Sequence, residues 1–302
     1  MMDETVGSIS SRKLTDESVF AELSNQGFCV LPSYLPSEQV KTLTAAARRL
    51  HPSWSDLLSE ELPSAGDLPS PNDFPSKSAG FPYEESCLNQ VIVAPDTIAL
   101  AKRWLETEQI CMRGSGCSVR YPGFVDGTGR HVDGFSLLPT NRASRRHNQL
   151  KFWYYLSDVE SEMAPTSFWP TQWDEDGPHV VGDEQKITGP AGSLVVFSIF
   201  TYHSRNNFIQ TNGERYVFTV RWGRRDHPWE GMSEYVMSGS NPAFSAFVGN
   251  LAPSTRELFH FPPVGHPYYT EETLSDLENR YPGWDAHGEY HAAIGTNGHT
   301  QL

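Results

Sequence analysis

The residues of this chain that could carry chemistry begin with His131 and Asp133, which stand two positions apart in the tripeptide His-Val-Asp. In a β-strand this spacing directs both side chains to the same face. A further histidine, His203, follows the apolar run Gly192–Tyr202. Two imidazoles and one carboxylate on one side of a metal form the facial triad that holds non-haem Fe(II) and leaves positions open for other ligands. We therefore predict that His131, Asp133 and His203 are metal ligands.

A His-x-Asp tripeptide is weak evidence on its own, because the two residue types fall two positions apart by chance in many chains. The alternative is a turn or a surface strand with ordinary hydrogen bonds. Two neighbouring features favour the metal site. The sequence Gly127–Gly129 is typical of a turn after which a strand can start at Arg130. The apolar strand predicted at 192–202 would end with His203 at the mouth of a cavity.

Arg215 opens the next predicted strand, after a turn at Thr211–Gly213. Period-two alternation gives one face of this strand to Arg215, Val217, Thr219 and Arg221, and the other face to aromatic and apolar residues. A buried guanidinium requires an anion. The distal carboxylate of 2-oxoglutarate would supply one through a bidentate contact, which makes Arg215 a candidate for co-substrate binding. The alternative for Arg215 and Arg221 is a structural pair with Asp or Glu.

The elements predicted to position these residues are a helical lead-in and a series of short strands. Thr15, Ser37 and Thr97 are candidate helix caps, Gly27 is a candidate helix end, and another helix is predicted at Glu271–Arg280. The predicted strands are Phe28–Leu31, Ser118–Tyr121, His131–Leu138, Leu150–Ser157, Gly192–Tyr202 and Tyr216–Trp222. This order predicts a mainly β fold with flanking helices, a double-stranded β-helix of the jelly-roll or cupin-like kind.

The domain organisation is predicted to be simple. Residues 1–13 are polar and are expected to be a flexible N-terminus, and residues 286–302 a flexible tail. Residues 14–285 are expected to form a single jelly-roll domain. Within it, the Pro- and Ser-rich stretch 52–85 is a candidate lid, and residues 223–285 are expected to pack around the barrel.

Composition excludes several classes of protein. The chain has 302 residues, 38% of them hydrophobic, and a formal net charge of −14. That charge argues against binding nucleic acid through its phosphates. No apolar run is long enough to span a membrane, and the N-terminus does not resemble a signal peptide. The four cysteines (Cys29, Cys87, Cys111 and Cys117) show no metal-binding spacing, so reduced thiols and a cytoplasmic location are expected.

In the order of its motifs the chain resembles the phytanoyl-CoA dioxygenase family. The motifs are Gly27-Phe28-x-Val30-Leu31, the His-x-Asp at 131–133, the run Gly192–Phe197 leading to His203, and Arg215. The resemblance covers roughly residues 15–222. It implies Fe(II), 2-oxoglutarate as co-substrate and O2, with oxidation of a C–H bond and release of succinate and CO2. Halogenases of the family lack the carboxylate ligand, so Asp133 disfavours halogenation.

One departure from the family concerns the substrate. Residues Ala164–Thr171 occupy the place of a glycine-rich stretch that ends Pro-Gly-Ser-His, but here Pro170 is followed by Thr-Gln-Trp. No substrate is therefore carried over. A basic cluster on a predicted loop (Arg142, Arg145, Arg146 and His147) would suit an anionic group on a small-molecule substrate, or is a solvated loop. Within Phe152–Tyr155, two aromatic residues should face the interior, either as a substrate wall or as core.

Further alternatives stay open from the residues alone. The hydroxyl of Ser204 or Thr219 is a candidate hydrogen-bond donor to the co-substrate carboxylate. Hydroxylation is the simplest outcome, but desaturation, cyclisation or rearrangement would use the same cofactors. A non-catalytic jelly-roll binding protein, or an enzyme acting on a protein side chain, is a competing hypothesis. The oligomeric state is open.

Overall fold

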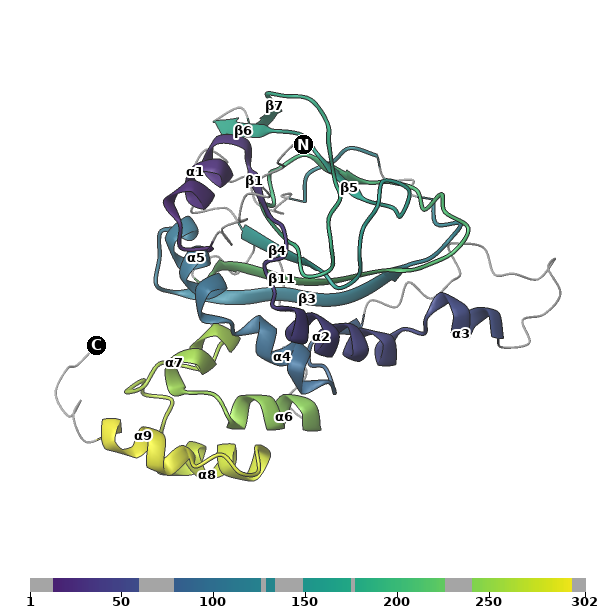
Figure 1. Ribbon diagram of the computed structural model, residues 1–302. Helices are drawn as coiled ribbons and strands as arrows, with labels where there is room; N and C mark the ends of the chain where they lie inside the picture. Colours follow the sequence, from purple (N-terminus) through teal and green to yellow (C-terminus); the bar gives the residue numbers. More distant parts are fainter. Residues whose placement is uncertain are drawn as a thin grey trace, which may run out of the picture.

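The largest element of the computed structural model is a six-stranded antiparallel sheet of order β1-β9-β4-β11-β3-β2 (Figure 1). A three-stranded sheet of order β10-β5-β8 and the pair β6-β7 complete the strands of the described residues, which are 13–59, 79–125, 129–133, 149–174, 177–225 and 241–294. The strands are β1 (Phe28–Leu31), β2 (Ala79–Gly80), β3 (Ile110–Arg120), β4 (Gln149–Tyr155), β5 (Thr166–Phe168), β6 (Thr171–Asp174), β7 (Gly177–Val180), β8 (Gln185–Ile187), β9 (Leu194–Ser198), β10 (His203–Arg205) and β11 (Arg215–Arg224).

In sequence the helices lie before β3 or after β11, with β1 and β2 between the early helices. They are α1 (Glu17–Gln26), α2 (Ser37–Leu50), α3 (Trp54–Ser59), α4 (Ser86–Ile92), α5 (Pro95–Leu105), α6 (Pro242–Gly249), α7 (Pro253–Arg256), η3 (Glu257–Phe259), α8 (Glu271–Arg280) and α9 (Ala286–Ile294). Figure 1 shows α6 to α9 on the side of the large sheet opposite β5. None of the helices in the described residues is long and apolar enough to cross a membrane.

Strand β11 shows how the sequence divides the protein into an interior and an outer layer. Its residue Val217 packs in a cluster between the two sheets, together with Tyr155, Phe168 and Phe197. The alternate residues of β11 pack instead in the large cluster beneath the helices; they are Tyr216, Phe218, Val220 and Trp222. The predicted alternation of this strand is therefore confirmed, and Arg215, Thr219 and Arg221 share the parity of the inner face.

One predicted helix end is confirmed, but the three predicted N-caps are not. Gly27 ends α1 in the left-handed region (φ 81°), where its N–H donates to the Leu23 carbonyl. The predicted caps are wrong: Asp16, Pro36 and Ala94 occupy the N-cap positions of α1, α2 and α5. Pro95 at the start of α5 has no N–H that needs a partner.

The outer layer joins the C-terminal helices to the sheet through aromatic contacts. Phe81 stacks on Phe259, with ring centroids 5.6 Å apart, and meets the edges of Phe244 and Phe247. Tyr83 in turn contacts Phe218 of β11. One buried cluster thus includes residues of the sheet and of the C-terminal helices. The division of the chain into an N-terminus, one domain and a tail stays a prediction.

Three predictions about local structure need correction. Strand β3 begins at Ile110, well before the predicted Ser118, because Gly114 and Gly116 lie within the strand rather than in a turn. The apolar run 192–202 is not one strand, since β9 ends at Ser198 and His203 begins β10. A flexible tail from residue 286 is wrong for 286–294, which form α9.

The buried residue that fixes α9 is Tyr290. Its ring lies 4.3 Å from that of Tyr269 and 5.9 Å from that of Trp284. Of the candidate lid 52–85, the structure describes α3 and β2 at its two ends, and residues 60–78 lie outside the described residues. The lid therefore stays a prediction.

Candidate metal centre

His131, Asp133 and His203 lie together because two short backbone segments pair. His131 and His203 form an antiparallel bridge in which each N–H donates to the other's carbonyl at 2.9 Å. The Asp133 N–H donates to the Ile199 carbonyl at 2.9 Å, which ties the second residue of the pair to the turn before β10. Residues 72 positions apart in the sequence are thereby held side by side.

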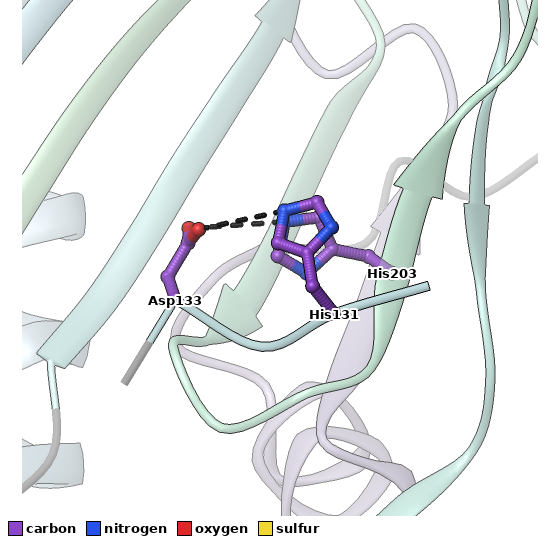
Figure 2. A group of neighbouring side chains, drawn as sticks. All are labelled: His131, Asp133 and His203. Carbon is purple, nitrogen blue, oxygen red and sulfur yellow. Dashed lines mark ion pairs between the residues drawn. The ribbon is translucent and has the colours of Figure 1, made fainter. Parts of the chain in front are cut away.

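The three side chains point toward one another, as Figure 2 shows. His131 Nε2 lies 3.8 Å from Asp133 Oδ1, and His203 Nε2 lies 3.7 Å from Asp133 Oδ2. One potential ligand atom from each residue lies within 4.8 Å of the others. This spacing leaves room for one ion bound by all three residues.

Backbone carbonyls orient both imidazoles. His131 Nδ1 lies 2.9 Å from the Gly129 carbonyl oxygen, and His203 Nδ1 lies 2.9 Å from the Thr201 carbonyl oxygen. A carbonyl oxygen only accepts, so each Nδ1 carries the proton and each Nε2 keeps its lone pair. Both lone pairs belong to the nitrogens that face Asp133, which is the tautomer that metal-ligating histidines adopt.

Burial and charge set the protonation of the group. Burial lowers the pKa of His203 to about 4, although Asp133 acts in the opposite direction. Burial raises the pKa of Asp133, but the charges of Lys151 and of the two histidines outweigh it and lower the pKa to about 2. Near neutral pH His203 is therefore neutral and Asp133 is ionised, as divalent metal ions require of their ligands.

Aromatic side chains fix the His203 ring from two sides. Phe168 of β5 stacks on it with ring centroids 5.7 Å apart, and Phe197 of β9 lies at 5.2 Å. His203 itself is 4% exposed. These contacts restrict the ring to one orientation without supplying a competing hydrogen bond.

Lys151 is the residue of this site that sequence reasoning missed. It lies on β4, and its Nζ donates to Asp133 Oδ2 at 2.5 Å. Alternation in β4 was the available signal, because Lys151 has the same parity as Trp153 and Tyr155, both of which pack in the inner cluster. The prediction that two aromatic residues of 152–155 face the interior is confirmed by this pair.

Arg215 is buried at the start of β11 with 1% of its surface exposed. Its Nη1 donates to the Ala164 carbonyl, and burial lowers its pKa to about 10, so it stays charged near neutral pH. Among the described residues it forms no ion pair, and its buried Nε has no hydrogen-bond partner. The structural Arg–Asp or Arg–Glu pair that was the alternative is thus not found in the described part of the chain.

A second buried arginine shows what a structural pair looks like in this fold. Arg256 is 0% exposed, and its guanidinium contacts both carboxylate oxygens of Glu289. It also donates to the Val248 and Gly249 carbonyls and lies 4.1 Å from the centroid of the Trp284 ring. Arg215 has a similar degree of burial, but no carboxylate of the described residues pairs with it, which is the difference expected of an arginine that binds an anionic ligand.

The other predicted site residues are placed as follows. Ser204 lies on β10 opposite Ser167, and alternation directs its side chain away from the face of His203. The Thr219 hydroxyl donates to the Gly116 carbonyl at 3.3 Å, and Arg221 Nη2 donates to the Arg113 carbonyl at 3.4 Å. The basic cluster Arg142, Arg145, Arg146 and His147 lies outside the described residues. A co-substrate role for Ser204 or Thr219 stays a prediction.

The donor set fits a divalent metal together with a dicarboxylate. Among the residues that the structure describes, the buried donors Arg215 Nε and Trp153 Nε1 have no hydrogen-bond partner. Buried donors are normally paired, so each has room for an acceptor that the described residues do not supply. A carboxylate near Arg215 would satisfy the guanidinium and balance its charge.

Comparison with solved structures places this arrangement in a known fold. The chain is similar to EctD from S. alaskensis, solved with 2-oxoglutarate and 5-hydroxyectoine: 16% identity, 74% of this chain and 82% of that chain covered, TM-score 0.52. It is also similar to EvdO2 from Micromonospora carbonacea var. aurantiaca complexed with 2-oxoglutarate: 17% identity, 71% and 96% covered, TM-score 0.50. The fold is a double-stranded β-helix. No protein-family model matches the chain, and no curated protein matches its sequence.

Proposed function

We propose that this protein is an Fe(II)- and 2-oxoglutarate-dependent oxygenase that oxidises a C–H bond of a small molecule and releases succinate and CO2. The observation that carries the proposal is the pairing of a two-histidine, one-carboxylate cluster with a buried arginine that has no acidic partner among the described residues. The cluster suits Fe(II), and the arginine suits the far carboxylate of the co-substrate.

Each residue has a defined role in this proposal. His131 and His203 present Nε2 lone pairs, because their Nδ1 protons are engaged by backbone carbonyls. Asp133 supplies one negative charge and a carboxylate oxygen. Arg215 holds the far end of the dicarboxylate, and the aromatic rings around His203 exclude water from that side of the site. Bound Fe(II) supplies the redox chemistry that activates dioxygen.

The similar structures support the co-substrate. EctD and EvdO2 were both solved with 2-oxoglutarate bound, and we extend this ligand to the present chain because Arg215 offers a buried cation for it. We also propose membership of the phytanoyl-CoA dioxygenase family, on the order of the motifs from Gly27 to Arg215. Hydroxylation is the simplest outcome. Desaturation, cyclisation or rearrangement needs the same residues and depends on how the substrate lies.

A visible charge-transfer band tests the proposal. Adding 2-oxoglutarate anaerobically to the Fe(II)-loaded protein should produce the band, because the co-substrate would bind directly to a metal held by His131, Asp133 and His203. The band should be absent in His131→Ala. Succinate release in air, measured over a panel of candidate small molecules, should stop in the same variant. Normal turnover by His131→Ala would falsify the ligand assignment. Metal binding without 2-oxoglutarate consumption would favour a non-catalytic binding protein.

A further inference from the structure

The interior holds another polar group whose hydrogen bonding is incomplete. Thr166 of β5 is 0% exposed, and its buried hydroxyl has no hydrogen-bond partner among the described residues. A buried hydroxyl has given up its hydrogen bonds to water, and such groups are normally paired within the protein. We therefore expect a group that the described residues do not supply beside the Thr166 side chain.

The strand pairing places Thr166 on the same face as the candidate metal ligands. On β5, Thr166 has the parity of Phe168, whose ring stacks on that of His203 with centroids 5.7 Å apart. The residue between them, Ser167, faces the other way, where its hydroxyl donates to Glu184 Oε1 at 2.5 Å. Two residues of a strand span about 7 Å. The Thr166 side chain thus faces the interior, one such step along β5 from the residue that contacts His203.

Arg215 reaches the same region from the large sheet. Its guanidinium donates through Nη1 to the carbonyl of Ala164, two residues before Thr166. The hydroxyl of Tyr155 donates at 3.0 Å to the carbonyl of Ile187, the residue paired with Thr166 on β8. Burial raises the pKa of Tyr155 to about 12, and the charge of Arg215 and the backbone of Thr166 act in the opposite direction. Both residues therefore lie close to the Tyr155 hydroxyl, in the same part of the interior.

The backbone just before Thr166 is held in an unusual conformation. Ala164 is buried and has φ 52°, in the left-handed region that residues other than glycine rarely adopt. The carbonyl of this alanine is the acceptor for Arg215, and β5 begins two residues later. Strained backbone of this kind is concentrated at ligand sites, where the surrounding structure holds it in place. The conformation of Ala164 thus supports a binding role for this segment.

The unpaired donors of Arg215 and Thr166 suit a single carboxylate. Arg215 Nε has no hydrogen-bond partner among the described residues, and the Thr166 hydroxyl can donate one hydrogen bond. A carboxylate accepts through two oxygens, so each donor can meet a different oxygen. A water molecule would satisfy the hydroxyl but would leave the buried charge of the guanidinium unbalanced.

We propose that the hydroxyl of Thr166 donates a hydrogen bond to the far carboxylate of 2-oxoglutarate, beside the guanidinium of Arg215. This inference rests on the proposed function and names a hydroxyl other than those of Ser204 and Thr219. It also gives the pair a role in specificity. A 2-oxo acid with an apolar end leaves both buried donors unpaired, so the site discriminates against it.

Thr166→Val tests the inference, because valine keeps the shape of threonine and removes the hydroxyl. Calorimetric titration of 2-oxoglutarate into the Ni(II)-loaded variant should give a Kd about 10- to 100-fold above that of wild type, since a hydrogen bond to a charged group is lost. The Tm of the metal-free variant should equal or exceed that of wild type, because no hydrogen bond of the Thr166 hydroxyl within the described residues is broken.

Thr97→Val is the matched control, since Thr97 is also a buried threonine, with 2% of its surface exposed. Its hydroxyl is paired and donates to the Ala94 carbonyl at 2.8 Å at the start of α5. This variant should therefore lower the Tm and leave the Kd for 2-oxoglutarate within about threefold of wild type. Thr166→Ser and Thr166→Ala repeat the test with smaller side chains: the serine variant should bind 2-oxoglutarate like wild type, and the alanine variant like Thr166→Val.

A second ligand locates the contact. 2-Oxovalerate has the same five-carbon chain with a methyl group in place of the far carboxylate, so its Kd should be the same in Thr166→Val as in wild type. The inference is overturned if Thr166→Val and Thr166→Ala bind 2-oxoglutarate like wild type, or if they weaken 2-oxoglutarate and 2-oxovalerate equally. Wild-type protein that takes up Ni(II) and does not bind 2-oxoglutarate would overturn the proposed function itself, before any variant is compared.

Discussion

Replacing Arg215 by methionine should separate ligand binding from stability. Methionine keeps much of the side-chain volume and removes the charge. Arg215 is 1% exposed and has no carboxylate partner among the described residues. Losing a buried, hydrogen-bonded charge contact to the co-substrate should cost about 2–4 kcal/mol of binding free energy, which is about a 30- to 1,000-fold rise in the Kd for 2-oxoglutarate.

The stability of the ligand-free protein should change much less. Removing the guanidinium leaves the Ala164 carbonyl without its donor, which costs about 1–3 kcal/mol. It also removes a buried unpaired cation, and replacing buried charges by apolar side chains can stabilise by about 1–4 kcal/mol. These effects oppose each other, so the free energy of unfolding should change by less than about 2 kcal/mol.

Arg256→Met is the matched control, since both arginines are almost fully buried. Arg256 is paired with Glu289, so its loss should destabilise the fold by about 3 kcal/mol. The 2-oxoglutarate affinity of the folded protein should stay within about threefold of wild type, because substitutions at distant sites that share no partner have independent effects.

The assay combines calorimetric titration of 2-oxoglutarate into the Ni(II)-loaded protein with urea unfolding of the metal-free protein. The reasoning is refuted if Arg215→Met binds 2-oxoglutarate like wild type and loses several kcal/mol of stability. That result would make Arg215 a structural residue of the same kind as Arg256.

Three further predictions concern pH and folding. In metal-free protein, His203 titrates near 4 when folded and near 6.5 when unfolded, so the unfolded chain binds more protons between these values. The free energy of unfolding should therefore fall by about 2–3 kcal/mol as the pH drops from 7 to 4.5, and by less in His203→Gln, as measured in urea. Gly27→Ala should lower the free energy of unfolding by about 1–3 kcal/mol, because φ is 81° and a Cβ would lie 2.6 Å from Thr201 Oγ1; unchanged stability in the melting curve would contradict this. Tyr290→Ala should cost about 3–5 kcal/mol because its buried ring packs α9 against Tyr269, and a Tm equal to that of wild type would contradict this.

The sequence predicted the parts of the fold that depend on short-range periodicity. The alternating faces of β11, the end of α1 at Gly27 and the helix Glu271–Arg280 needed only neighbouring residues. Strand β3 was predicted too short, and Gly114 and Gly116 lie in the part that the prediction left out. In the fold they lie opposite Thr219 and Arg221 on β11. Such long-range pairing is not visible in a local pattern.

The candidate site also has residues that the sequence predicted and one that it did not. His131, Asp133 and His203 were found from their types and order, although His203 begins a strand rather than ending one. Lys151 was missed because a lysine in a strand is usually exposed, and only the packing of Trp153 and Tyr155 shows that its face is the inner one. Its contact with Asp133 joins two segments whose proximity depends on the whole sheet.

The central claim is that one metal ion and one dicarboxylate share this interior. A crystal structure of the protein with Ni(II) and 2-oxoglutarate tests it most directly. The account predicts the metal bound by Nε2 of His131, Nε2 of His203 and a carboxylate oxygen of Asp133, with the far carboxylate of 2-oxoglutarate against the guanidinium of Arg215. A metal bound elsewhere, or 2-oxoglutarate bound away from Arg215, would contradict it.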